Sequence, residues 1–311
     1  LTPVAVTGVT PTITEIDKEY AVIHMSYVVE SMNDKKSHYY QVDEYYNVTY
    51  NRSSEMVKLL AFDRYQESFF DSGYISKDRN SISMGVTNDP AEYVTSEDYG
   101  ILAFVRLGQL WMYKYNDSSL TNIFSYPQDS FSDARTLNTN LDINIADMDA
   151  DGNIYFVVYG YMNRGEHEGK NGMSLYYYSA ENMTTQELFF VECDESYDIM
   201  KKETGRFTYY NAQTNKFYYL LDETLYEVSL ADMTQTALVE GIPSAKYFVS
   251  ANRKLVAYPN NAEDEQVTAI TIQNFETGET YEKTCASGDL LLALGFVEND
   301  LIYGWGGRGG G

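Results

Sequence analysis

A pattern of paired strand-like segments returns along most of this 311-residue chain and constrains its fold more than any other feature. In each copy an alternating apolar segment is followed by a polar turn residue, nine positions after its start, and then by a second short segment. Copies begin at Met112, Leu175, Leu225 and Ile270, and an earlier one is predicted from Val57. The turn residues are Thr121, Thr184, Thr234 and Glu279. Because apolar alternation is typical of half-buried strands, each copy predicts two strands joined by a turn.

A further pair of strand-like segments lies upstream of each copy, joined by a tight turn rich in Asn, Asp and Gly. The second strands of these pairs are predicted to begin at Ile101, Ile154, Phe217, Leu255 and Leu301. Turn residues of this kind between two strand patterns favour hairpins. Each repeat is therefore predicted to hold four short antiparallel strands, called a, b, c and d in chain order.

Four-stranded units that recur every few tens of residues suggest the blades of a β-propeller. One small sheet cannot bury both of its faces, and packing blades face to face around an axis solves that problem. On this pattern, residues 50–304 resemble the β-propeller superfamily. The chain carries neither the Trp-Asp ending of WD40 repeats nor the Ser-x-Asp-x-Gly-x-x-Trp box of sialidases, and its tryptophans are Trp111 and Trp305. The chain also resembles the extracellular part of uncharacterised anchored proteins of anaerobic Gram-positive bacteria, which implies no known activity.

The predicted fold is thus all-β, a β-propeller of about five to seven four-stranded antiparallel blades. A single domain is expected over residues 1–304, followed by a Gly-rich tail over 305–311. The segment after Leu290 begins a last blade with two strands only. Because propellers normally close their ring, we expect residues 1–50 to complete that blade, unless its strands come from sequence beyond this chain.

The charge and composition narrow the classes of partner. The chain has 46 acidic and 22 basic residues and a net charge of −24, which repels phosphate backbones and argues against nucleic acid. The longest apolar run, 290–297, is far shorter than the roughly 20 residues that a membrane helix needs, so no insertion is predicted within this chain. Thirty tyrosines suit strands with broad half-buried faces. Cys193 and Cys285 fall two blades apart, so free thiols are predicted.

One turn between strands a and b carries acidic residues at alternate positions, as calcium loops do. The candidate oxygen ligands are Asp147, Asp149, Asp151 and Asn153. Gly152 would allow the sharp bend of such a loop. However, the twelfth position holds Val158 where an EF-hand has a bidentate Glu, and the ninth holds Tyr155 where integrin-like loops offer a carboxylate. The segment is therefore either a cation site for Ca²⁺ or an Asp-Gly turn that leads into strand b.

Long loops gather at one end of the predicted blades. Insertions between strands b and c cover 162–172 and 259–266, and long d–a links cover 126–140 and 192–205. In propeller topology these loops emerge on the same face, and long loops on a rigid scaffold often carry binding residues. The candidate partner-binding residues are Arg164, Glu166, His167, Glu168 and Lys170. None of the three histidines is spaced as a metal-ligand pair, and a glycine-flanked loop positions catalytic groups poorly, so no catalytic residue is assigned.

Three functions remain open at this point. The leading one is a non-catalytic extracellular binding or scaffold propeller, anchored at the cell surface, that engages a protein or glycan through the b–c and d–a loop face. The second is a propeller enzyme, a hydrolase or lyase acting on glycans, which would need converging carboxylates. The third is a sensor domain of a membrane-anchored protein. No cofactor is expected beyond the candidate calcium ion.

Overall fold

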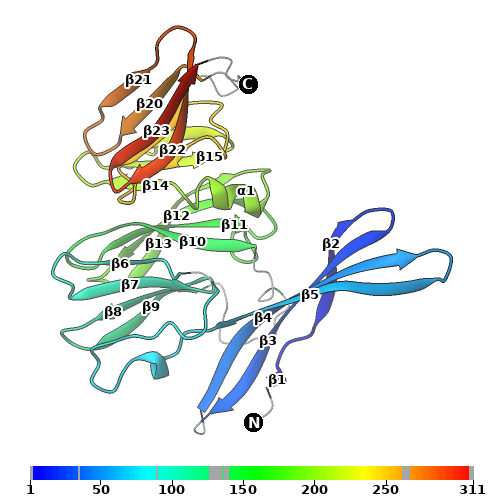
Figure 1. The fold of residues 1–311 in the computed structure, drawn as a ribbon. Helices are drawn as coiled ribbons and strands as arrows, with labels where there is room; N and C mark the ends of the chain where they lie inside the picture. Colours follow the sequence, from blue (N-terminus) through cyan, green and yellow to red (C-terminus); the bar gives the residue numbers. More distant parts are fainter. Residues whose placement is uncertain are drawn as a thin grey trace. The chain divides into compact units, whose positions relative to one another are not determined.

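A computed structural model describes residues 3–33, 36–88, 90–125, 135, 140–260 and 267–307. Within residues 1–304, which we predict to form one domain, the chain divides into two compact units. The first comprises 1–139 with 163–168, and the second comprises 140–162 with the chain from 169 onward. Nearly all regular structure is antiparallel β-sheet (Figure 1).

The first unit opens with a sheet of long strands. Its members are β1 (Val4–Ala5), β2 (Thr10–Ile16), β3 (Tyr20–Asn33), β4 (Lys36–Asn51) and β5 (Met56–Ser68). They pair in the order β1-β3-β4-β5, and β2 also pairs with β3. None of the described strands in residues 1–50 pairs with the last hairpin of the chain. Completion of the last blade by residues 1–50 is therefore not seen among the described strands.

The prediction of a strand pair from Val57 is wrong. Residues 56–68 form one strand, β5, which pairs with β4 from Asn51↔Met56 to Tyr40↔Ser68. The turn lies before this segment, where the Asn51 side chain accepts hydrogen bonds from the backbone of Ser53 and Ser54. No glycine, proline or asparagine interrupts residues 56–68, so the strand runs on past the position where the repeat predicts a turn.

The four-stranded blades are confirmed. The first unit contains β6 (Tyr93–Thr95), β7 (Ile101–Arg106), β8 (Gln109–Lys114) and β9 (Ser119–Ser125), and a short 3₁₀ helix, η1 (Ser72–Tyr74), precedes them. The second unit contains β10 (Leu141–Met148), β11 (Ile154–Tyr161), β12 (Asn171–Ser179) and β13 (Thr184–Glu192). Each set pairs in simple chain order. The described chain thus shows the antiparallel a-b-c-d blade that the repeat predicts.

Two more blades and a hairpin complete the second unit. A short helix, α1 (Tyr197–Lys202), leads to β14 (Thr208–Asn211), β15 (Lys216–Leu221), β16 (Thr224–Ser229) and β17 (Thr234–Val239). The next blade consists of β18 (Phe248–Val249), β19 (Leu255–Pro259), β20 (Ala269–Asn274) and β21 (Thr280–Thr284). The hairpin consists of β22 (Asp289–Val297) and β23 (Asp300–Gly307). Strand b begins at the predicted residue or one residue before it in every case.

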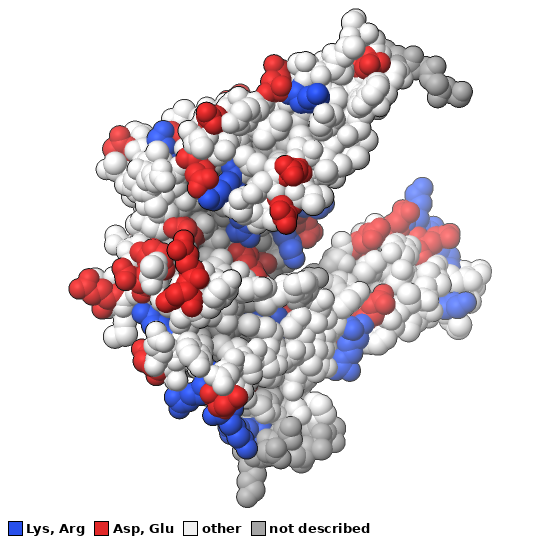
Figure 2. Space-filling view, turned by 60° about the vertical axis from the view of Figure 1, so that its left-hand side comes forward, with Lys and Arg blue, Asp and Glu red and all other residues white. Residues whose placement is uncertain are grey.

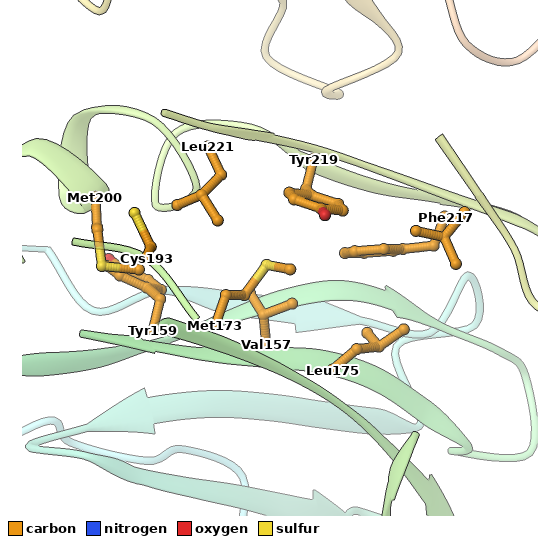
Figure 3. Packing of buried hydrophobic residues seen from close by; sticks show 10 residues of the cluster. Val157, Tyr159, Met173, Leu175, Cys193, Met200, Phe217, Tyr219 and Leu221 are labelled. Atoms are coloured by element: carbon orange, nitrogen blue, oxygen red, sulfur yellow. The ribbon is translucent and has the colours of Figure 1, made fainter. Parts of the chain in front are cut away.

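Apolar side chains pack between neighbouring blades of the second unit. Between the β10–β13 and β14–β17 blades lie Val157, Met173, Leu175, Phe217 and Tyr219, all fully buried (Figure 3). Corresponding clusters join the β14–β17 blade to the β18–β21 blade and that blade to the β22–β23 hairpin. Burial of aromatic and branched side chains between sheets is the main favourable term for such stacking.

A buried polar network links three of these blades at strands β10 and β14. The Asn144 side chain on β10 is fully buried and donates to the Thr208 hydroxyl at 2.9 Å and to the Thr204 carbonyl at 3.1 Å. Arg253, from the β18–β19 turn, donates to the Asn144 side-chain oxygen and, at 2.9 Å, to the Ile145 carbonyl. One guanidinium therefore ties the β18–β21 blade to the β10–β13 blade.

Arg253→Met is expected to lower the free energy of unfolding by about 2 kcal/mol or more, because buried acceptors on Asn144 and Ile145 lose their donor. The neighbouring Lys254→Met is the matched control. Lys254 forms a half-exposed ion pair with Glu276 at 2.5 Å, and its loss should cost less than about 1 kcal/mol. Urea unfolding followed by tyrosine fluorescence measures both. Equal losses in the two variants would contradict a locking role for Arg253.

Candidate functional site

The acidic turn after β10 is built around the Asp149 carboxylate. Its Oδ1 accepts hydrogen bonds from the backbone nitrogens of Asp151 at 3.0 Å and Asn153 at 2.9 Å, and its Oδ2 accepts one from the Asn153 side chain at 2.8 Å. Gly152 has a φ of 87°, which favours glycine and closes the turn. The Asn153 side chain in turn accepts from the backbone of Ala180. Asp149 therefore holds the a–b turn together and joins it to the c–d turn.

Asp147 points into a more enclosed setting than Asp149. Burial, together with the nearby Asp149 charge, raises the pKa of the Asp147 carboxyl, although a backbone hydrogen bond from Met148 opposes the shift. The Tyr155 ring stacks on Tyr210, with 4.0 Å between ring centroids. Burial raises the pKa of the Tyr155 hydroxyl above its usual range.

The four candidate ligands span the end of β10, which holds Asp147, and the turn that follows it. Within the described part of the chain, no group of three or more His, Cys, Asp or Glu side chains is arranged to hold a metal ion. The hydrogen bonds of Asp149 give this carboxylate a structural role without a cation. Calcium binding at Asp147, Asp149, Asp151 and Asn153 stays a prediction.

The loop between β11 and β12 carries the candidate partner-binding residues. Its base is closed by two backbone hydrogen bonds, from Met162 to the Lys170 carbonyl at 2.8 Å and from Gly169 to the Met162 carbonyl at 2.9 Å. Positive φ angles at Gly165 and Gly169 turn the chain at either side of the tip. The loop is thus a defined turn of the backbone, which positions its side chains.

Ion pairs hold two of the candidate residues. Glu168 pairs with Arg135 at 3.0 Å, and the Asn163 side chain donates to the Arg135 carbonyl at 2.9 Å. Lys170 pairs with Glu192, at the end of β13, at 2.6 Å. The other three, Arg164, Glu166 and His167, lie at the tip, where Glu166 is exposed and the other two are half-buried.

The remaining predicted loops are described only in part. The link after β13 is described throughout and contains the short helix α1. Residues 261–266 of the second b–c insertion lie outside the described residues, as does the 126–140 link apart from Arg135 and Asn140.

Both cysteines are free, as predicted, with Cys193 buried and its thiol pKa raised by that burial.

A buried carboxyl at the end of α1 was not found by sequence reasoning. Glu203 is fully buried, and its Oε1 accepts a hydrogen bond from the backbone of Glu223, in the β15–β16 turn, at 3.2 Å. Its Oε2 has no hydrogen-bond partner among the described atoms. Burial, with the charges of Glu195 and Glu223, raises the pKa of Glu203 to about 7. Nothing local distinguishes this residue from the other acidic residues of the sequence.

Comparison with known proteins finds similarity among solved structures only. A scan against protein-family models finds no match. A search of curated proteins finds no match. Among solved structures, the chain is similar to TolB from Acinetobacter baumannii, with a TM-score of 0.39 and 10% identity over 96% of this chain and 76% of TolB.

Two peptidase structures are also similar. Dipeptidyl peptidase 4 from Porphyromonas gingivalis matches with a TM-score of 0.39 and 12% identity over 86% of this chain and 41% of that protein. A puromycin-hydrolyzing peptidase from Mycobacterium tuberculosis matches with a TM-score of 0.40 and 9% identity over 95% of this chain and 50% of that protein. The chain therefore spans half or less of these two relatives. No helix of the described residues is long and apolar enough to cross a membrane.

Asp149→Ala is expected to lower stability by about 1 kcal/mol, because the turn loses the acceptor of three hydrogen bonds. Asp149→Asn keeps the Oδ1 acceptor and should lose less stability. Thermal melts should rank the wild type and the two variants in the same order in EDTA and in millimolar calcium. The differences in melting temperature between the proteins should also be the same in both buffers. A calcium-dependent rise in the wild-type melting temperature that both variants abolish would instead establish a cation site.

Glu203 should make the stability depend on pH. Its pKa is raised in the folded state, so its favourable contribution is complete below the unfolded value of 4.5 and is lost as the pH rises through about 7. Glu203→Gln, which mimics the protonated side chain, should therefore be the more stable protein at pH 8, by roughly 3 kcal/mol at most. At pH 4.5 the two proteins should have nearly equal stability. Urea titrations at the two pH values measure the difference, and a constant difference would contradict the prediction.

Proposed function

We propose that this chain is a non-catalytic binding propeller, displayed outside the cell, which engages a protein partner through its b–c and d–a loops. The observation that carries the proposal is the anchored loop over 162–170. Two backbone hydrogen bonds close its base, and two half-exposed ion pairs lie at its flanks. A loop held in one conformation loses less conformational freedom on binding than a flexible insertion does.

The topology of the β10–β13 blade supports the choice of face. Tyr161 pairs with Asn171, and Gly172 pairs with Glu192, so the b–c loop and the d–a link leave the same end of the sheet. The a–b turn at Asp149 and the c–d turn lie at the other end, where Asn153 joins them. The long segments therefore extend from one end of the blade and the short turns from the other.

The net charge of −24 supports a protein partner with a basic surface. The two segments carry exposed Glu166, Asp194 and Asp198, with exposed Lys201 and Lys202 on the same link. Asp and Glu side chains are spread over the view in Figure 2, with Lys and Arg side chains among them. Complementary charge raises the rate of encounter and orients the partner.

Two alternatives have less support. A glycan would favour exposed aromatic rings, but the 162–170 loop contains none, and Tyr197 on the link is half-buried and stacks on Tyr159. A glycan-acting enzyme would need a carboxyl that meets its substrate. Glu203 has the pKa of a general acid, but its side chain is fully buried, which favours a structural role.

Photo-crosslinking tests the proposal in cells that make the protein. A photoreactive residue in place of Glu166 or Asp198 is expected to give a discrete protein adduct. The same residue in place of Glu181, an exposed Glu in the c–d turn of the same blade, is the matched control and should give none. Equal labelling at all three positions would contradict a binding face. Binding to a neutral oligosaccharide array that depends on the 162–170 loop would replace the protein partner with a glycan.

A further inference from the structure

A cleft of about 520 Å³ lies between the β14–β17 and β18–β21 blades, both of which belong to the second unit. Its volume falls within the range of small-molecule sites, roughly 300–1,000 Å³. The side chains that line its two walls include Lys216, Tyr218 and Glu227 on one side and Tyr258, Gln273 and Thr280 on the other. Each wall therefore presents an aromatic ring together with polar groups.

The turn between β20 and β21 lines one end of the cleft, and a buried side chain holds it in place. Asn211, at the end of β14, is 4% exposed and donates to the Phe275 carbonyl at 2.8 Å and to the Glu276 carbonyl at 3.1 Å. The Phe275 ring packs against Tyr218 and Phe207, with 4.8 Å between ring centroids in both pairs. The cleft is therefore preformed, which reduces the conformational freedom lost on binding.

An ion pair in the first wall keeps hydrogen-bonding capacity for a ligand. The Lys216 ammonium donates to the Glu227 carboxylate at 2.6 Å, and their side chains are 37% and 21% exposed. The Tyr218 hydroxyl also hydrogen-bonds this carboxylate. Because an ammonium has several donors and a carboxylate several lone pairs, both groups retain unused positions. A donor and an acceptor are thus held side by side in the cleft.

The opposite wall offers an oriented amide. The Thr280 hydroxyl donates to the Gln273 side-chain oxygen at 2.7 Å. The Gln273 side-chain nitrogen has no hydrogen-bond partner among the described residues. Leu238, which is 41% exposed, adds apolar surface to the lining, next to the small exposed part of Tyr258. The cleft therefore combines polar groups from both walls with a limited apolar surface.

This combination favours a neutral ligand with several hydroxyls. The charged side chains of the described lining all have ion-pair partners, because Lys216 pairs with Glu227, and Glu276 pairs with Lys254. A phosphate or a metal cation would need an unpaired counter-charge, and the net charge of −24 repels anions further. Neighbouring hydroxyls of a sugar ring can donate to a carboxylate and accept from an adjacent ammonium. The C–H groups of the ring suit a small apolar surface.

We propose that the cleft between the β14–β17 and β18–β21 blades binds a neutral saccharide. One ring hydroxyl donates to Glu227, and its neighbour accepts from Lys216. A hydroxyl on the other side of the sugar accepts from the Gln273 side-chain nitrogen. This site is distinct from the one proposed for a protein partner, because the 162–170 loop contributes no residue to the lining.

A blocking variant and a matched control test the site. Thr280→Trp places a large side chain in the cleft from an exposed position on β21. Thr184→Trp makes the same change at the exposed first residue of β13, outside the lining. On an array of neutral oligosaccharides, the wild type and Thr184→Trp are expected to bind the same saccharides, and Thr280→Trp should bind none. Circular dichroism and melting temperature establish that both variants keep the fold.

Glu227→Gln tests the chemistry of the contact. The substitution keeps the size of the side chain and removes its charge, so the bond from the sugar hydroxyl is weakened. Titration calorimetry with the arrayed saccharide that the wild type binds most tightly should give a Kd about tenfold higher for this variant. Hydrogen exchange gives a second readout. In the wild type the amides of the 274–279 turn should exchange more slowly with that saccharide present, and in Thr280→Trp they should not change.

Other results would overturn the proposal. A wild type that binds no neutral saccharide of the array would exclude the site. Equal binding by the wild type and Thr280→Trp would place the saccharide elsewhere on the molecule. Binding confined to sialylated or sulfated saccharides would mean that charge, rather than the hydroxyl pattern, selects the ligand.

Discussion

Apolar packing between the faces of neighbouring blades is the constraint on which the second unit depends. Each small sheet presents buried side chains on both sides, such as Phe217 and Tyr219 toward the β10–β13 blade and Tyr218 and Leu220 toward the β18–β21 blade. Because successive strand residues point to opposite faces, one apolar strand can serve both neighbours. A run such as Phe217–Leu221 therefore belongs in the middle of a stack. The same run would be costly in a sheet with one face in water.

Because the blades are stabilised by packing between their faces, the loops that join the strands contribute little to stability. The core lies between the sheets, so the segments that join them can lengthen with little effect on stability. The b–c loop of the β10–β13 blade takes up nine residues between Tyr161 and Asn171, whereas Asp222 and Glu223 alone join β15 to β16. Both of those short-turn residues have positive φ, and the buried Glu203 binds the turn from the neighbouring link. Similar blades therefore carry b–c connections of very different lengths.

The sequence predicted the blade strands well and the buried polar groups poorly, for physical reasons. Alternation and turn residues are local signals, so strand b is placed to within one residue at Ile154 and Leu255. The link between Asn144 and Arg253 joins residues 109 positions apart, and its chemistry depends on burial that no local pattern records. Asp149 was visible as one of three acidic residues at alternate positions before Gly152. Its role as the acceptor that closes the turn follows from backbone geometry, and acidic spacing alone suggests a cation equally well.

Strand β5 and the β22–β23 hairpin show the limit of the alternation signal. Alternating apolar residues report that a strand will be half-buried, but they do not report what will cover it. In the middle of the stack the next blade covers each face, and the signal is read correctly. At Val57 and Ile302 the same signal appears in strands whose apolar side chains remain exposed. The regularity that identifies the blades therefore predicts the strands, whereas burial of both strand faces depends on neighbouring sheets that a local pattern does not record.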